Sequence, residues 1–277
     1  MLKLMYITNQ PKIAKIADEN GVDRIFIDLE TIGKQERQGG MDTVQSRHSI
    51  EDISKVKAMV SKAEIMVRVN PLHDALEEYV SSKDEIEAVI EAGADIIMLP
   101  YFKSAKEVET FIQYVDGRAR VLPLVETPEA VSCIDEILSI DGLDEIFVGL
   151  NDLSLGYGKK FMFELLIDGT LETLCLKFRQ KGIPFGFGGI ASLGKGMLPS
   201  EYIVREHYRL ESTCTILSRS FCRTDLVRNL DEVRYIFETG IPEIRILEKE
   251  CEKHSAFFRE NRKEVLEKIQ VICDGEK

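Results

Sequence analysis

The chain has 277 residues, of which 44% are hydrophobic and 30% are charged, and it contains 8 prolines. This length and composition allow a sizeable buried core, either in one α/β barrel of about 250 residues or in two small domains. The 48 acidic residues outnumber the 36 basic ones and give a formal net charge of −12, which argues against nucleic acid and anionic membranes as partners.

The sequence carries no pattern typical of export or of cross-linking. No stretch reaches the roughly 20 apolar residues that a membrane-spanning helix needs, and the first residues do not resemble a signal peptide, so we expect a cytoplasmic protein. The six cysteines form no Cys-x-x-Cys pair, so neither a zinc ribbon nor a disulfide framework is predicted.

Eight short apolar or β-branched runs recur along the chain, each followed by a longer segment with helical periodicity. This alternation is typical of βα units, and eight parallel strands close a (β/α)8 TIM barrel. Pro123 lies inside the fifth run and lacks the N–H that a sheet ladder needs, but we still predict a strand there. The predicted strands are Leu2–Ile7, Arg24–Leu29, Ile65–Asn70, Asp95–Pro100, Val121–Glu126, Glu145–Leu150, Phe185–Gly189 and Cys214–Ser218.

The last part of the chain is predicted to be helical and to exceed what a barrel requires. We assign residues 1–223 to the barrel and residues 224–277 to a C-terminal helical extension, with helices at Pro242–Phe258 and Asn261–Cys273. Such an extension is a candidate for packing on, or exchange with, a neighbouring subunit, so a homo-oligomer is expected.

Polar side chains end several predicted strands, and barrel active sites lie at the carboxyl ends of the strands. Two connections at that face are longer than packing requires, and we expect both Thr31–Ser49 and Asn151–Gly158 to be loops. The polar residues are Asp28 and Glu30 after strand two, Arg68 and Asn70 after strand three, Glu126 after strand five, Asn151 and Asp152 after strand six, and Ser218 and Arg219 after strand eight. Separate segments therefore converge on one mouth.

Glu126 and Asp152 are expected to lie one strand apart, close enough to share an ion. Two adjacent carboxylates need a cation to offset their repulsion, and carboxylate oxygens favour Mg²⁺ or Mn²⁺. The alternative is that each carboxylate caps the helix that follows it. The occurrence of both on adjacent strands, with Arg68 directed at the same mouth, favours the metal site.

Arg68 lies between Val67 and Val69, so its guanidinium points to the inside of the barrel. A buried guanidinium requires an anion. Two roles are open: Arg68 holds Asp28 or Glu30 structurally, or it binds a carboxylate or enolate oxygen of a substrate.

Four of these segments together resemble the hydroxy-oxo-heptanedioate aldolase and citrate lyase β-subunit family, within the phosphoenolpyruvate/pyruvate-domain barrels. The resemblance covers roughly residues 2–223, and Glu-Thr-Pro-Glu-Ala followed by Asn-Asp-Leu-Ser is its most specific feature. The segments are Ile27-Asp28-Leu29-Glu30, Val67-Arg68-Val69-Asn70, Val125-Glu126-Thr127-Pro128-Glu129-Ala130 and Val148-Gly149-Leu150-Asn151-Asp152-Leu153-Ser154.

The resemblance implies a metal-dependent carbon–carbon lyase, an aldolase. Mg²⁺, or else Mn²⁺ or Co²⁺, would be held by Glu126 and Asp152, and pyruvate or oxaloacetate would chelate it. Arg68 would stabilise the enolate oxygen, because charge appears there only as the carbon–carbon bond forms or breaks. The partner of the keto acid would be an aldehyde or a thioester.

One departure from the family concerns the catalytic base. Metal-dependent aldolases of the family carry a His directly after the Glu of the strand-two motif, where this chain has Thr31. His48 is a candidate replacement, and the alternative is a solvated loop side chain. Citrate lyase β-type members use an Arg downstream, which favours Arg37 as a contact for the partner substrate, and the alternative is an exposed charged loop.

The resulting site prediction has three sets of residues. Catalytic candidates are Arg68, Glu30 and His48; substrate-binding candidates are Asp28, Arg37, Asn151, Ser218 and Arg219; and metal candidates are Glu126 and Asp152.

Two other functions compete with the aldolase. One is a CoA-ester lyase or thioesterase of the citrate lyase β type, and the other is a barrel that binds a keto acid without catalysis. The segment Ile216–Phe221 also looks similar to relatives found in bacterial surface-polysaccharide gene sets. That similarity implies a role in polysaccharide biosynthesis and a sugar-derived aldehyde as partner.

Overall fold

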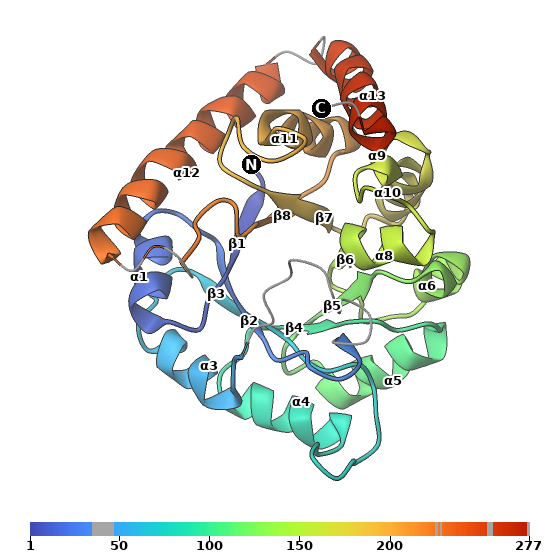
Figure 1. Cartoon of the computed structure of the whole chain (residues 1–277). Helices are drawn as coiled ribbons and strands as arrows, with labels where there is room; N and C mark the ends of the chain where they lie inside the picture. The colour runs from blue at the N-terminus through green and yellow to red at the C-terminus, as the bar shows by residue number, and fades with distance from the viewer. Residues whose placement is uncertain (35–46, 225–226, 228, 254–256, 276–277) are drawn as a thin grey trace.

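Eight parallel strands form a closed barrel in the computed structural model, which describes residues 1–34, 47–224, 227, 229–253 and 257–275. Each strand pairs with its neighbour in sequence, and the last pairs with the first (Figure 1). The strands are β1 (Lys3–Ile7), β2 (Arg24–Asp28), β3 (Glu64–Arg68), β4 (Ile96–Leu99), β5 (Arg120–Val125), β6 (Ile146–Val148), β7 (Phe185–Ile190) and β8 (Cys214–Leu217). The (β/α)8 barrel and all eight predicted strands are confirmed.

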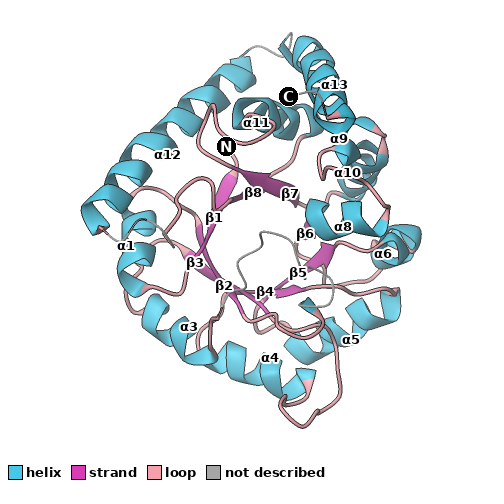
Figure 2. Ribbon diagram, viewed as in Figure 1, coloured by secondary structure: helices cyan, strands magenta, loops and turns pink. Residues whose placement is uncertain are grey.

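Helices surround the ring of strands on the outside, as Figure 2 shows. Ser81, Ser104 and Thr127 begin three of them with side-chain oxygens that accept backbone N–H bonds. The helices are α1 (Pro11–Glu19), α3 (Ile50–Lys57), α4 (Ser82–Glu91), α5 (Ala105–Val115), α6 (Pro128–Ser132), α7 (Ile134–Ile137), α8 (Leu150–Gly156), α9 (Glu164–Ile167), α10 (Thr170–Lys181), α11 (Ser200–Leu210), α12 (Leu230–Lys253) and α13 (Phe257–Asp274). None of the helices formed by the described residues is long and apolar enough to cross a membrane.

Apolar side chains fill the inside of the barrel, so the interior is a packed core and not a pore. The inner cluster consists of Met5, Phe26, Met66, Ile96, Met98, Leu122, Leu124, Phe147 and Cys214. Their neighbours along each strand point outward to the helices, because successive side chains of a strand face opposite sides. Polar side chains beyond this packed layer therefore lie at the mouth, above an apolar floor.

Pro123 is accommodated within β5 because hydrogen bonds to the β6 side are made before and after it. The Val121 N–H donates to Asp144 Oδ2 at 2.8 Å, and the Val121 carbonyl accepts the Glu145 N–H at 3.2 Å. Beyond the proline, the Val125 carbonyl accepts the Gly149 N–H at 3.0 Å. The N–H that the proline lacks is therefore one missing donor within a connected pair of strands.

Two predicted segments are corrected by the structure. The helix expected at Pro242–Phe258 begins earlier, because α12 runs over Leu230–Lys253 with Pro242 in its interior, and Phe258 belongs to α13. Val233, Phe237, Ile241 and Ile244 are buried where α12 packs on α1 and α11, and this burial outweighs the hydrogen bond that the proline removes.

The connection after β6, expected as a loop over Asn151–Gly158, is largely helical as α8. Leu150 and Leu153 are both buried in α8, at a spacing that places them on one face of a helix. The division of the chain at residue 223, the exchange of the extension between subunits and the homo-oligomer stay predictions.

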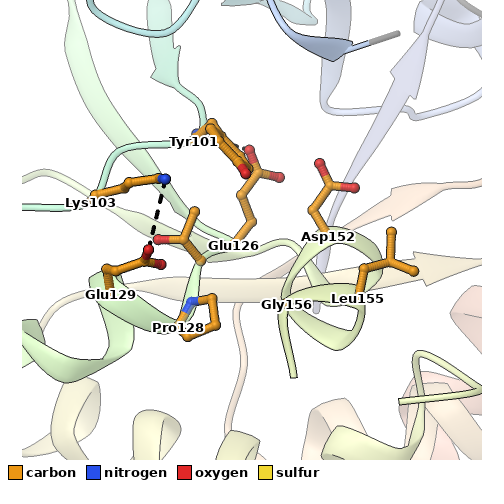
Figure 3. A pocket seen from close by; sticks show the side chains of 9 residues that line it. Tyr101, Lys103, Glu126, Pro128, Glu129, Asp152, Leu155 and Gly156 are labelled. Carbon is orange, nitrogen blue, oxygen red and sulfur yellow. Dashed lines mark hydrogen bonds and ion pairs between the residues drawn. The ribbon is translucent and has the colours of Figure 1, made fainter. Parts of the chain in front are cut away.

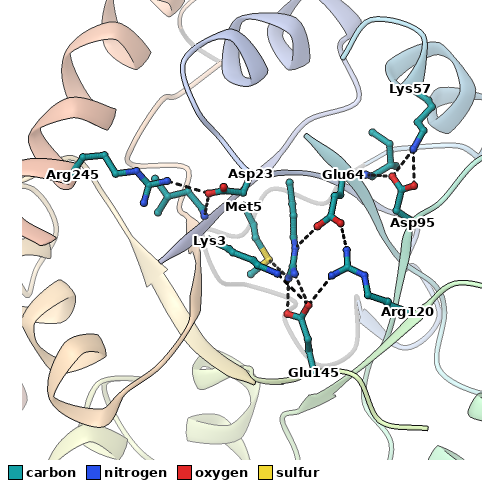
Figure 4. Close-up of polar contacts among 12 residues, drawn as sticks. Lys3, Met5, Asp23, Lys57, Glu64, Asp95, Arg120, Glu145 and Arg245 are labelled. Carbon is teal, nitrogen blue, oxygen red and sulfur yellow. Dashed lines mark hydrogen bonds and ion pairs between the residues drawn. The ribbon is translucent and has the colours of Figure 1, made fainter. Parts of the chain in front are cut away.

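A cluster of charged side chains closes the opposite end of the barrel (Figure 4). Arg24 is fully buried there, and its guanidinium donates to both carboxylate oxygens of Glu145, at 2.8 and 2.5 Å. Glu64 contacts Arg24 and Arg120, and Arg120 reaches Glu145 at 3.2 Å. Lys3 lies 3.8 Å from Glu145. Each buried charge in this cluster has an opposite partner.

His207 of α11 is an uncharged titratable group in the core. Its ring stacks on Phe187 with centroids 3.8 Å apart, and its Nδ1 lies 2.8 Å from Ser212 Oγ. Its Nε2 has no hydrogen-bond partner among the described residues. Burial lowers the pKa of His207 to about 3, so the folded protein resists the proton that the unfolded chain takes up.

Glu145→Gln should lower the free energy of unfolding by about 3–5 kcal/mol, because it leaves the buried Arg24 without its carboxylate. Urea denaturation checks this. Adding Arg24→Met should recover much of the loss, and Glu87→Gln, which removes an exposed pair with Arg118, should cost at most about 1 kcal/mol. Equal losses for Glu145→Gln and Glu87→Gln would contradict the structural role of the cluster.

Lowering the pH from 7 to 5 should destabilise the protein by about 2 kcal/mol through His207 alone. The unfolded imidazole binds a proton below its ordinary pKa of 6.5, whereas the folded one, with a pKa of about 3, stays neutral in this range. Stability is therefore lost as the pH falls. His207→Phe keeps a stacked ring but cannot titrate, so urea denaturation at both pH values should show a drop about 2 kcal/mol smaller. An identical drop in both proteins would refute the assignment.

Candidate active site

A cavity of about 220 Å³ opens at the carboxyl ends of the strands. Its floor is apolar and includes Phe26, Met98, Leu124 and Phe147 of the inner cluster. Its polar lining residues are Arg68, Glu126, Asn151, Asp152 and Ser218. The structure thus brings together five of the ten predicted site residues around one space.

Glu126 and Asp152 lie side by side at this cavity (Figure 3). Glu126 directly follows β5, and Asp152 is in the first turn of α8. The helix after each residue begins elsewhere, because Thr127 is the N-cap of α6 and Gly149 occupies the N-cap position of α8. Glu126 Oε1 accepts the backbone N–H of Tyr101 at 2.9 Å. The Glu126 carboxylate therefore does not cap the helix that follows it, which was the alternative to a metal site.

The surroundings of Glu126 are strongly negative. Burial and the charges of Glu30 and Asp152 raise the pKa of Glu126 to about 8, although Arg68 and the Tyr101 N–H oppose the shift. A carboxylate whose ionised form is this unfavourable is stabilised by a bound cation, which offsets both the burial and the repulsion.

A ring of four charged side chains stands behind the cavity. Arg68 donates to both oxygens of Asp28, at 2.8 and 2.9 Å, and its NH1 lies 3.2 Å from Glu30 Oε2. Lys34 Nζ lies 2.7 Å from Asp28 Oδ2 and 3.5 Å from Glu30 Oε2. Burial alone would raise the pKa of Asp28, but Arg68 and Lys34 outweigh it and hold that pKa well below its usual range. Both carboxylates thus bridge both cations.

Among the described residues of the mouth, carboxylates outnumber cations. Four buried carboxylates, Asp28, Glu30, Glu126 and Asp152, lie there with two cations, Arg68 and Lys34. An excess of buried carboxylates favours the binding of a divalent metal. The described residues contain no group of three or more His, Cys, Asp or Glu side chains placed to hold a metal, so water and substrate oxygens would complete the coordination of an ion on Glu126 and Asp152.

Gly149 makes room for the Glu126 carboxylate. A Cβ at this position would lie 2.8 Å from Glu126 Oε2 and 2.9 Å from its Cβ, closer than real contacts allow. Glycine is thus required here by the close approach of β6 to the end of β5, and the residue is tied to the position of the predicted metal ligand.

Asn70 anchors the chain after β2. Its Oδ1 accepts the backbone N–H groups of Thr31 and Ile32 at 2.9 and 3.0 Å, and its Nδ2 donates to Glu85 Oε1 at 2.8 Å. The start of the connection that carries Lys34 is therefore fixed to the end of β3.

A second cavity, of about 370 Å³, reaches the same carboxylate pair from the outside. It is lined by Tyr101, Lys103, Glu126, Thr127, Pro128, Glu129, Asp152, Leu155 and Gly156. Lys103 and Glu129 form an ion pair of 3.7 Å across one side of it, as Figure 3 shows. Glu126 and Asp152 thus border two spaces, and the second, which we call the outer cavity, has the larger share of polar lining.

The other described site residues that were predicted are not among those that line the cavity. Asp28 and Glu30 belong to the ring behind Arg68. His48 Nδ1 accepts the Asp28 N–H at 3.0 Å, and burial lowers its pKa despite the opposing charges of Asp28 and Asp52. Arg219 is exposed. Arg37 lies outside the described residues. The roles of all predicted site residues stay predictions.

Three residues of the site were not predicted from the sequence. Lys34 follows Glu30 by four positions, a spacing that allows an ion pair across one helical turn and could have signalled the contact. Asn70 was noted only as a polar strand end. Tyr101 acts through its backbone N–H, with a left-handed φ of 49°, and no side-chain pattern reveals that.

Residues 3–166 match the sequence model of the HpcH/HpaI aldolase/citrate lyase family. The match runs from β1 into α9. It includes the four carboxylates and both cations of the mouth, and it ends before β7 and β8.

Curated proteins with similar sequences are aldolases. The chain is 26% identical over 142 residues to a hydroxypyruvate/pyruvate aldolase of Rhizorhabdus wittichii, covering 42% of this chain and 55% of that protein. It is 24% identical over 151 residues to a 2-keto-3-deoxy-L-rhamnonate aldolase of Escherichia coli, covering 43% of this chain and 56% of that protein. The chain thus spans about half the length of the curated relatives it matches.

Solved structures of similar fold extend over most of the chain. An HpcH/HpaI aldolase from Desulfitobacterium hafniense superimposes with a TM-score of 0.61 at 15% identity, covering 84% of this chain and 93% of that one. An HpcH/HpaI aldolase/citrate lyase family protein from Burkholderia cenocepacia gives 0.62 at 15% identity, covering 84% and 94%. At this identity the likeness shows the fold.

Gly149→Ala should weaken Mn²⁺ binding by about tenfold or more, because the new Cβ displaces the Glu126 carboxylate. Calorimetric titration with Mn²⁺ measures this. Gly189→Ala is the matched control, since it lines the same cavity but its Cβ would have 3.4 Å or more to its neighbours. If both variants bound Mn²⁺ as tightly as the unaltered protein, Glu126 would not be a metal ligand.

Proposed function

Because the chain belongs to the HpcH/HpaI aldolase/citrate lyase family, we propose that it is a metal-dependent carbon–carbon lyase. It forms or breaks the bond between the enolate of a pyruvate-type keto acid and an aldehyde. The observation that carries the proposal is the pair of buried carboxylates, Glu126 and Asp152, which borders a small cavity that Arg68 also lines. Such a site stabilises a dication and, through it, an anionic substrate.

The residues of the mouth have different proposed roles in binding the metal and the keto acid and in stabilising the enolate charge. Glu126 and Asp152 hold Mg²⁺, with Mn²⁺ or Co²⁺ as alternatives, which supplies positive charge next to the keto acid when bound. Arg68 donates to the oxygen that becomes negative in the enolate, and its aspartate partner keeps it charged and oriented. Asn151 and Ser218 line the cavity and orient the carboxylate of the keto acid. The apolar floor excludes water from the reacting groups.

The contact that His48 makes does not favour it as the proton acceptor. Its Nδ1 accepts the Asp28 N–H, so the neutral ring carries its proton on Nε2 and has no lone pair directed at the cavity. Glu30 is in the ring with Arg68 and Lys34, adjacent to the cavity lining. Of the two predicted bases, Glu30 is the one whose position the geometry favours.

The aldehyde partner is proposed to be sugar-derived. The outer cavity borders the carboxylate pair and offers an ammonium, a carboxylate and the Tyr101 ring, a mixture suited to hydroxyl groups. The relative from Escherichia coli is named for a deoxy sugar acid, which supports the same substrate class.

Mn²⁺- or Mg²⁺-dependent exchange of deuterium into pyruvate, followed by NMR, tests enolate formation without knowledge of the aldehyde. Glu126→Gln should slow the exchange by about 100-fold or more, because it removes a charged metal ligand. Glu136→Gln, the same change on the exposed side of α7, should exchange normally. If metal and pyruvate bound without exchange, the chain would be a barrel that binds a keto acid without catalysis. If acyl-CoA competed with pyruvate for binding, CoA-ester chemistry would be favoured.

A further inference from the structure

The ammonium of Lys34 is buried between two carboxylates, although the residue belongs to a polar connection. Only 6% of Lys34 is exposed, and its Nζ contacts both Asp28 and Glu30. These are the same two carboxylates that bind Arg68. Burying a lysine is costly unless it is paired, so the position of this ammonium calls for a physical reason.

Lys34 contacts the carboxylates that hold Arg68 and does not itself line the cavity. Among the described residues, Arg68 lines the cavity, whereas Lys34, Asp28 and Glu30 do not. A guanidinium has five N–H groups, and the contacts with Asp28 and Glu30 engage Nε, NH2 and NH1. The second N–H groups of NH1 and NH2 are then left for a ligand in the cavity.

The ammonium of Lys34 weakens the attraction between the guanidinium of Arg68 and the two carboxylates that both cations share. Without Lys34, Asp28 and Glu30 would lose one of the two cations that the described residues supply to both of them, and the mouth would carry one more negative charge. Neither carboxylate lines the cavity, so their stronger pull would draw the guanidinium toward side chains outside the cavity lining and neutralise more of its positive field. An oxyanion would then be stabilised less.

The backbone around Lys34 is tied to the strand that carries Arg68. The Lys34 N–H donates to the Thr31 carbonyl at 3.3 Å, and Thr31 is held by Asn70 at the end of β3. Asn70 is held in turn by Glu85 of α4. The ammonium and the guanidinium are therefore positioned from the same strand end, which favours a fixed relation between them.

We propose that Lys34 is a positioning residue for the reaction: by sharing Asp28 and Glu30 with Arg68, it keeps the guanidinium directed at the cavity and available to the enolate oxygen. This inference rests on the proposed function, because enolate formation is where its effect is measured. It assigns to Lys34 no contact with the substrate.

Lys34→Met should lower the turnover number of metal-dependent pyruvate exchange by about 100-fold, the scale of a misplaced catalytic group. Its affinity for Mn²⁺ should stay the same or increase, because a positive charge near Glu126 has been removed. A merely structural role would weaken both. Lys57→Met is the matched control, since Lys57 loses an ion pair with Asp95 at the other end of the barrel; it should exchange at the normal rate.

A second measurement distinguishes the loss of the Lys34 ammonium from a disturbance of the fold. In Lys34→Ala, added ethylammonium should restore part of the exchange rate, whereas ethanol or sodium ions at the same concentration should not. Full exchange by Lys34→Met, parallel loss of Mn²⁺ binding, or no rescue of Lys34→Ala would each overturn the role of Lys34 alone. Absence of exchange in the unaltered protein would overturn the proposed function, and this inference with it.

Discussion

The bidentate contact between Arg68 and Asp28 is the interaction on which the mouth of the barrel depends. It joins the ends of β2 and β3, and it makes two buried side chains of opposite charge compatible with an apolar floor. Removing either side chain would leave the other buried with one opposite charge fewer, at a cost of about 3–5 kcal/mol. Glu30 and Lys34 are arranged around this pair, and the direction of the guanidinium follows from how the four groups share their charge.

The two ends of the barrel use buried charges in opposite ways. At the closed end, Arg24 and its neighbours satisfy one another, and the cluster includes two carboxylates, Glu64 and Glu145, with three cations. Among the described residues of the mouth, the carboxylates outnumber the cations by two. Ion pairs within a cluster of both signs stabilise the fold, whereas an excess of buried carboxylates stabilises a positive group that binds among them. This difference separates the structural cluster from the candidate site on physical grounds.

The barrel was predictable because strand and helix periodicities repeat eight times, and the placement of Glu126 and Asp152 followed from adjacent strand ends. The start of α12 was not, because Pro242 is a typical first-turn residue and only the tertiary burial of Phe237 and its neighbours carries the helix through it. Lys34 lies in the segment Thr31–Ser49, which was expected to be a loop, and its burial was not predicted. Its burial depends on Asn70, 36 positions later in the sequence, and local patterns do not contain such contacts.

Tyr101 contributes to the site with two separate parts, its backbone and its side chain. Its backbone N–H supports Glu126, while its ring lines the outer cavity. The left-handed backbone costs an ordinary residue about 1–2 kcal/mol, and glycine or asparagine adopts it more readily. The shape of the outer cavity can therefore be redesigned at this position, by a smaller or larger side chain, while the amide that holds the Glu126 carboxylate is retained. Directed evolution at Tyr101 can thus vary the shape of the cavity without removing the hydrogen bond to Glu126.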